Sequence, residues 1–116
     1  MTTLKRTPWG DPQSSLELAE GIIFYSTARH GGIHLDRTRR NAMPPALRAL
    51  ETFAGGPWYE EDCDWAIVAL AFPDAFKPAD VGCAVDIAAH YFKDRLDLAA
   101  YLTTETGQRC IERAKK

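Results

Sequence analysis

The alternation of apolar and polar residues near the start of the chain predicts a β-hairpin. Residues 14–19 alternate in the manner of a half-buried strand. Residues 22–27 are β-branched and aromatic, as strands prefer, and the Glu20-Gly21 pair between the two runs suits a tight turn. A third short strand is expected over residues 33–35, after a segment rich in histidine and glycine.

Helical patterns dominate the rest of the chain. Asp36 suits the N-cap of a first helix, which should stop near Met43 because Pro44 disfavours helical geometry in the residue before it. The chain then predicts helices at residues 46–53, 60–72, 78–92 and 95–101, with a last polar turn at residues 108–116.

Residues 60–72 leave two structures open. The acidic residues at 60–62 favour a helix N-terminus through the helix dipole, and the apolar residues that follow fall at helical spacing. The alternative is a strand over residues 66–72. The capping signal and the frequent alanines favour the helix.

Together these elements predict an α+β fold, in which a small antiparallel sheet of about three strands is followed by three to five helices packed against it. The 116 residues fit a single domain over residues 1–116 with a modest core. Residues 1–13 are rich in turn formers and predict an extended N-terminal arm, which Trp9 anchors on the body.

Charge and composition exclude several classes of protein. A formal net charge of −2 argues against broad electrostatic capture of nucleic acid. The longest apolar run, residues 65–72, is too short to span a bilayer, and the N-terminus lacks the apolar segment of a signal peptide. The three cysteines form no metal-binding or disulfide pattern. We therefore expect a cytoplasmic protein without membrane contact, metal or cofactor.

The segment at residues 27–34 is the first candidate site. Its adjacent glycines could free backbone amides to form an anion-binding concavity, and Arg29 could add a bidentate contact to phosphate or carboxylate. His30 could act as an acid or base near neutral pH, although it could also merely cap a turn. The candidate binding residues of this segment are Thr27, Arg29, His30, Gly31 and Gly32.

The segment at residues 58–65 carries four carboxylates between aromatic residues and is the second candidate site. The carboxylates could cap a helix, hold a cation such as Mg²⁺, or pair with arginines of the chain or of a partner. On a helix Glu60 and Asp64 would share a face, so the acids would point in two directions. The candidate binding residues are Trp58, Tyr59, Glu60, Glu61, Asp62 and Asp64.

No catalytic signature is present in the sequence, which contains no nucleophile elbow, phosphate-binding loop or zinc-protease motif. No residue is therefore assigned a catalytic role, and a non-enzymatic protein is favoured. If the chain is an enzyme, His30 is the candidate acid or base and Glu61 the carboxylate that would orient it or hold a metal.

Four short strings, taken in order, resemble an uncharacterised domain family of phage- and plasmid-borne proteins in proteobacteria. They are Thr-Pro-Trp-Gly at residues 7–10, the run at 21–32 that ends in Ser-Thr-Ala-Arg-His-Gly-Gly, Met-Pro at 43–44, and Trp-Tyr-Glu-Glu-Asp-Cys-Asp-Trp-Ala at 58–66. The likeness covers about residues 7–76.

This resemblance implies an accessory protein of a mobile element. We expect a binding protein that inhibits host defence, such as an anti-CRISPR, through an acidic and aromatic surface. Its partner would be a host protein or a protein–nucleic-acid defence complex. The alternative is a small enzyme or sequestering protein that acts on a nucleotide or phosphoester through the Arg-His-Gly-Gly segment.

Overall fold

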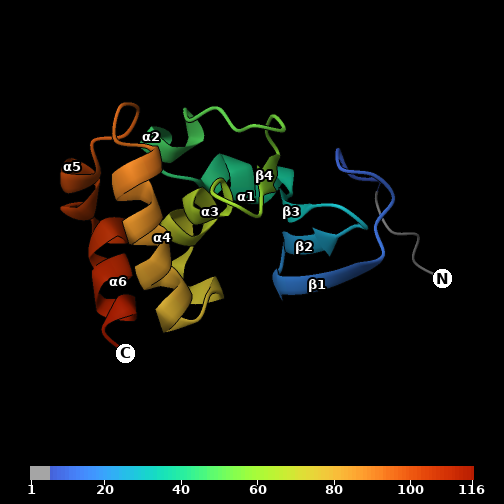
Figure 1. Cartoon of the computed structure of the whole chain (residues 1–116). Helices are drawn as coiled ribbons and strands as arrows, with labels where there is room; N and C mark the ends of the chain where they lie inside the picture. The colour runs from blue at the N-terminus through green and yellow to red at the C-terminus, as the bar shows by residue number, and fades with distance from the viewer. Residues whose placement is uncertain (1–5) are drawn as a thin grey trace.

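The computed structural model, which describes residues 6–116, places a sheet on one side of the molecule and most of the helices on the other (Figure 1). The four strands form one antiparallel sheet in the order β1-β2-β3-β4. Their bounds are Ser14–Ala19 for β1, Ile22–Ser26 for β2, Gly31–Leu35 for β3 and Trp58–Glu60 for β4. The predicted α+β class is confirmed, with a fourth strand that the sequence pattern did not predict.

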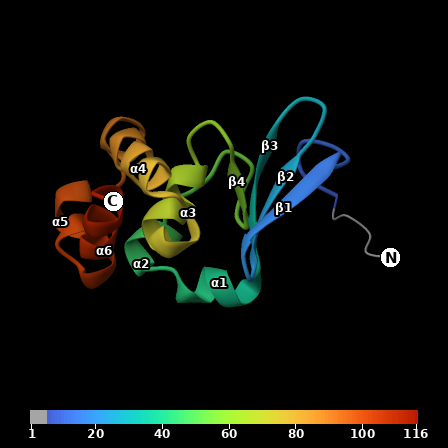
Figure 2. The same cartoon turned by 90° about the horizontal axis from the view of Figure 1, so that it is seen from below.

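Six α-helices and a short 3₁₀-helix make up the remaining elements of the described residues. They are α1 (Arg37–Ala42), α2 (Pro45–Arg48), α3 (Trp65–Ala71), η1 (Pro73–Ala75), α4 (Pro78–Tyr91), α5 (Leu98–Leu102) and α6 (Glu105–Ala114). Figure 2 shows α3 between the sheet and the outer helices α4, α5 and α6. In the part of the chain that the structure describes, no helix is both long enough and apolar enough to cross a membrane.

The core is built around α3. Every residue from Ala66 to Ala71 is buried, which a helix achieves only when other elements cover it on all sides. Strand β3 contributes Ile33 and Leu35 to the same core, and α4 contributes its buried Val81. Three of the six buried α3 residues are alanines, whose small side chains let neighbouring elements approach closely.

Several predicted boundaries are confirmed. The predicted hairpin is present as β1 and β2, with Gly21 at a φ of +82° in the turn. Helix α1 ends at Ala42, and the Asp36 carboxylate accepts a hydrogen bond of 2.8 Å from the backbone N–H of Arg39, as an N-cap does. The predicted helix at residues 78–92 is present as α4.

Residues 60–72 follow neither predicted alternative throughout. Glu60 ends β4, residues 61–64 form a turn, and the helix begins only at Trp65. The prediction of acids in the first helical turn is therefore wrong, and so is the shared helical face of Glu60 and Asp64. Pairing of residues 58–60 with β3 outweighs the local preference of the acids for a helix start.

Three further helices differ from their predicted bounds. The helix predicted at residues 95–101 is present as α5, which begins only at Leu98 and ends at Leu102. The predicted helix at residues 46–53 ends at Arg48, and the backbone N–H of Phe53 donates to the Asp64 carboxylate instead of continuing the helix. The predicted polar turn at residues 108–116 is the helix α6. Thr104 caps α6 through the N–H of Gly107, and a side chain at position 107 would lie 2.1 Å from the Tyr101 carbonyl oxygen.

Helices α5 and α6 each donate a side-chain hydrogen bond to the carbonyl oxygen of Leu70 in α3. The Tyr101 hydroxyl donates to this oxygen at 2.6 Å, and the Cys110 thiol donates to it at 3.2 Å. Burial raises the pKa of Tyr101 well above its usual range and raises the pKa of Cys110 to about 11. Both groups thus stay neutral in the folded chain at pH values where the unfolded chain ionises them.

This arrangement predicts a loss of stability at alkaline pH. The contribution of Cys110 is complete below pH 9.0 and disappears as the pH rises to about 11. It amounts to about 2 kcal/mol of unfolding free energy. Chemical denaturation at several pH values measures the loss, which should shrink in Cys110→Ala and persist in Cys83→Ala, where the replaced thiol is exposed. An identical pH dependence in all three proteins would contradict this role of Cys110.

Candidate functional site

The two candidate segments lie side by side because β4 pairs with β3. Gly32 is the register partner of Glu60, and Ile33 is the partner of Tyr59. The pairing continues past the end of β4, where the backbone N–H of Glu61 donates to the Gly31 carbonyl oxygen at 3.0 Å. Segments that lie thirty positions apart in the sequence therefore share one edge of the sheet.

The side chains of β4 alternate between the two faces of the sheet. Tyr59 points into the core with 3% of its surface exposed, and its hydroxyl donates to the Met43 sulfur at 3.4 Å. Trp58 lies on the other face, where ring centroids of Trp9, Tyr25 and His34 lie 5.7, 5.9 and 4.6 Å from its own. Both predicted aromatic contact residues are thus engaged in internal packing.

The two glycines of the first segment belong to β3 and are buried, so they form no loop. A side chain at position 32 would lie 2.3 Å from the Trp9 ring, and one at position 31 would lie 2.7 Å from the Tyr25 carbonyl oxygen. Gly32 is needed because Trp9 packs directly on the backbone of the sheet, and Gly31 is needed because the Tyr25 carbonyl oxygen and the Glu61 carboxylate leave no room for a side chain. The expectation that they free their amides for an anion is therefore wrong.

Only the turn at residues 27–30 remains of the expected loop. Thr27 closes it, because its hydroxyl donates to the His30 carbonyl oxygen at 2.6 Å and accepts from the His30 N–H at 3.1 Å. Arg29 and His30 are exposed at the tip of this turn. Glu61, the carboxylate paired with His30 in the enzyme hypothesis, instead lines an apolar groove.

That groove lies between the sheet and the start of the helical layer and has a volume of about 250 Å³. Leu16, on the edge strand β1, is 61% exposed there. The groove is lined by Leu16, Leu18, Phe24, Ile33, Glu61, Trp65, Phe76 and Asp80. Glu61 is therefore a carboxylate at the rim of an apolar surface.

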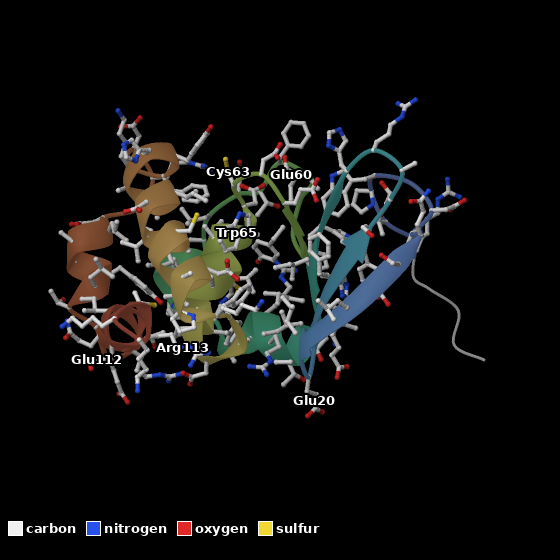
Figure 3. The ribbon with its side chains drawn as sticks, turned by 60° about the horizontal axis from the view of Figure 1, so that its bottom comes forward. Glu20, Glu60, Cys63, Trp65, Glu112 and Arg113 are labelled. Atoms are coloured by element: carbon white, nitrogen blue, oxygen red, sulfur yellow. The ribbon has the colours of Figure 1, made fainter. Side chains whose placement is uncertain are left out.

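The acidic residues after Glu61 have separate environments. Asp62 is exposed, whereas Asp64 is only 7% exposed and accepts a hydrogen bond of 2.8 Å from the N–H of Phe53. Between them Cys63 is half-buried against Tyr91, and burial raises the pKa of its thiol, an effect that the neighbouring carboxylates reinforce. Figure 3 shows Cys63 and Glu60 together on one side of the molecule, with Glu20 on the opposite side.

Two large aromatic side chains that the sequence reasoning did not select flank this turn. Phe53 is 89% exposed and Tyr91 is 65% exposed. The hydrogen bond from Phe53 to Asp64 and the contact between Tyr91 and Cys63 hold both residues beside the turn. We call this surface the acidic–aromatic patch; it consists of Phe53, Glu60, Asp62, Cys63 and Tyr91.

Sequence signals for these aromatic residues were weak. The two glycines that follow Phe53 and Ala54 favour an exposed loop. The helical pattern instead places Phe53 at the end of the helix predicted for residues 46–53. For Tyr91 and Phe92 the helical pattern left open which ring is buried. The structure buries Phe92 in the core and exposes Tyr91.

The arginines expected near the acids lie elsewhere. Arg39 donates to the Glu20 carbonyl oxygen at 2.7 Å and stacks over the ring of Phe72, and Arg40 lies beside the Tyr59 hydroxyl. Among residues 6–116, no group of three or more histidine, cysteine, aspartate or glutamate side chains is arranged to hold a metal ion. The carboxylate of Glu60 accepts a hydrogen bond from the backbone N–H of Asp62, and neither acid forms an ion pair with any of residues 6–116.

The packing of Trp9 on Gly32 predicts opposite effects for two glycine substitutions. Gly32→Ala should lower the unfolding free energy by about 1–3 kcal/mol, because the added methyl group collides with the Trp9 ring. Gly82→Ala should raise it by about 0.5–1 kcal/mol, since Gly82 is inside α4 and its added methyl group meets only Ala114 at 3.9 Å. Urea denaturation measures both; equal effects would contradict the packing argument.

Comparisons with known proteins place the chain in a family without assigning an activity. No curated protein and no solved structure gives a significant match. The model of one family, described as a domain of unknown function, matches residues 2–116. The uncharacterised domain family expected from the sequence is therefore confirmed, and the chain belongs to the family DUF7007.

Proposed function

We propose that this chain is a non-enzymatic binding protein of a phage or plasmid, and that it inhibits a host defence complex in the cytoplasm. The observation that carries the proposal is the acidic–aromatic patch. It combines two exposed aromatic rings with carboxylates that form no ion pair with any residue in the described part of the chain. An anti-CRISPR is one form that such an inhibitor could take.

The exposed rings support a protein partner. Phe53 and Tyr91 leave most of their side-chain surface exposed, and aromatic residues are enriched where proteins bind each other. Side chains of this kind often supply much of the binding energy when a partner covers them. They take the role that the sequence reasoning gave to Trp58 and Tyr59, which are packed within the fold.

The carboxylates indicate the charge of the partner. Glu60 and Asp62 on the patch, together with Glu61 at the rim of the neighbouring groove, present negative charge on one side of the molecule. A surface of this charge would steer the protein toward a basic surface and accelerate association. Nuclease complexes of host defence present such basic surfaces where they bind nucleic acid.

Two double variants test the proposal with the tagged chain, expressed in a host that carries a nuclease-based defence system. Phe53→Ser with Asp62→Lys should abolish co-purification of the defence complex and restore immunity of the host to phage. Asp94→Lys with Glu112→Lys makes charge reversals at exposed acids outside the patch, and should retain both activities. Figure 3 shows Glu112 at the far side of the helical layer from the patch.

The charge reversal alone has a defined kinetic effect. At low salt, Asp62→Lys should slow association with the purified complex by about tenfold, and the difference should shrink at high salt. Equal binding by the wild type and both double variants would refute the assignment of the patch as the contact surface. Absence of any retained complex from a set of defended hosts would refute the inhibitor function.

A further inference from the structure

A second concave surface lies at the other end of β4, where the chain enters the strand. It has a volume of about 560 Å³ and is bounded by the end of β3, by α1 and by α2. Its size falls in the range of pockets that hold small molecules. The lining residues are His34, Leu35, Asp36, Arg37, Arg40, Asn41, Arg48 and Pro57.

The charge of this pocket is opposite to that of the acidic–aromatic patch. It gathers three arginines in a chain whose net charge is −2. The one carboxylate in its lining, that of Asp36, is already engaged as the N-cap of α1 at 2.8 Å from the Arg39 nitrogen. Arg48 donates from Nη2 to the Met43 carbonyl oxygen at 3.2 Å. Three positively charged side chains that line one pocket favour an anion within it.

Arg40 provides the second, independent observation. Its Nε atom is buried and has no hydrogen-bond partner among the described residues. A buried donor without a partner costs free energy, and such groups in folded proteins commonly indicate an ion or water at the site. The guanidinium lies beside the Tyr59 hydroxyl, and it fits there because position 56 is glycine: a side chain would lie 2.7 Å from Nη2 of Arg40.

We propose that this pocket binds a small molecule with at least two phosphate groups, such as a nucleoside diphosphate. The planar donor forks of Arg37, Arg40 and Arg48 match phosphate oxygens, and one phosphate is too small to engage three guanidinium groups placed around a pocket of about 560 Å³. Asn41 offers a further amide donor. Leu35 and Pro57 supply apolar surface for the rest of the ligand.

This pocket is a better candidate for the anion site than the turn at residues 27–30, where the sequence predicts one. Arg29 and His30 are exposed at the tip of that turn, whereas Arg40 is partly buried and fixed by neighbours. Fixed donors lose less conformational freedom when they bind an anion, so they bind it more tightly. This inference does not rest on the proposed inhibitor function, because none of the pocket residues belongs to the acidic–aromatic patch.

Isothermal titration calorimetry with inorganic pyrophosphate and with ADP tests the proposal. We expect saturable binding of one molecule per chain, weakened by at least about tenfold in Arg37→Gln with Arg48→Gln, two exposed positions. Arg40→Lys keeps the charge but loses the fork, and should also weaken binding. Thermal unfolding confirms that each variant is folded, and pyrophosphate should raise the melting temperature of the wild type more than that of the variants.

The matched control is Arg6→Gln with Lys115→Gln, which removes the same charge from exposed positions outside the pocket. It should leave binding of both probes unchanged. Tighter binding of ADP than of pyrophosphate identifies a nucleotide as the ligand, and equal binding identifies the phosphate groups as sufficient; both support the site. Failure of the wild type to bind either probe overturns the proposal, as does equal weakening by the control, which would indicate nonspecific charge.

Discussion

The burial of α3 from Ala66 to Ala71 is the constraint on which the rest of this structure depends. A helical segment without an exposed face must be covered by the sheet on one side and by α4 and α6 on the other, as Figure 1 shows. The turn at residues 61–64 joins β4 directly to this helix, so the position of α3 fixes the position of the acids. The Leu70 carbonyl oxygen of α3 also accepts hydrogen bonds from Tyr101 of α5 and Cys110 of α6, so the position of α3 affects these two helices as well.

Two surfaces of opposite charge follow from the placement of β4 against β3. The residues before β4 lie beside the pocket that Arg37, Arg40 and Arg48 line, and the residues after β4 form the turn at 61–64 with its acidic side chains. The net charge of −2 is therefore unevenly distributed, with acidic residues on one surface and three arginines around the pocket. The aromatic cluster around Trp58 packs on the strand that lies between the two surfaces.

Local signals in the sequence predicted much of the fold, because the hairpin, the Asp36 cap and α4 depend on nearby residues. The site was harder to predict, because its parts depend on partners that are distant in the sequence. Gly32 has the sequence context of a loop glycine, but its place in the sheet depends on the packing of Trp9. Phe53 has the sequence context of a helical residue, but its backbone N–H donates to Asp64. Neither contact leaves a local pattern, and the helical spacing of Val81, Ala84 and Ala88 does not decide whether Tyr91 or Phe92 is buried.

Photo-crosslinking inside the host tests the central claim, that the acidic–aromatic patch is the surface by which this protein binds its partner. Benzoylphenylalanine replaces Phe53 in one variant and Ala99, an exposed residue of α5, in the other. The account predicts a discrete crosslinked product of the chain with a defence protein from position 53 and none from position 99. Equal products from both positions, or a product from position 99 alone, would contradict it.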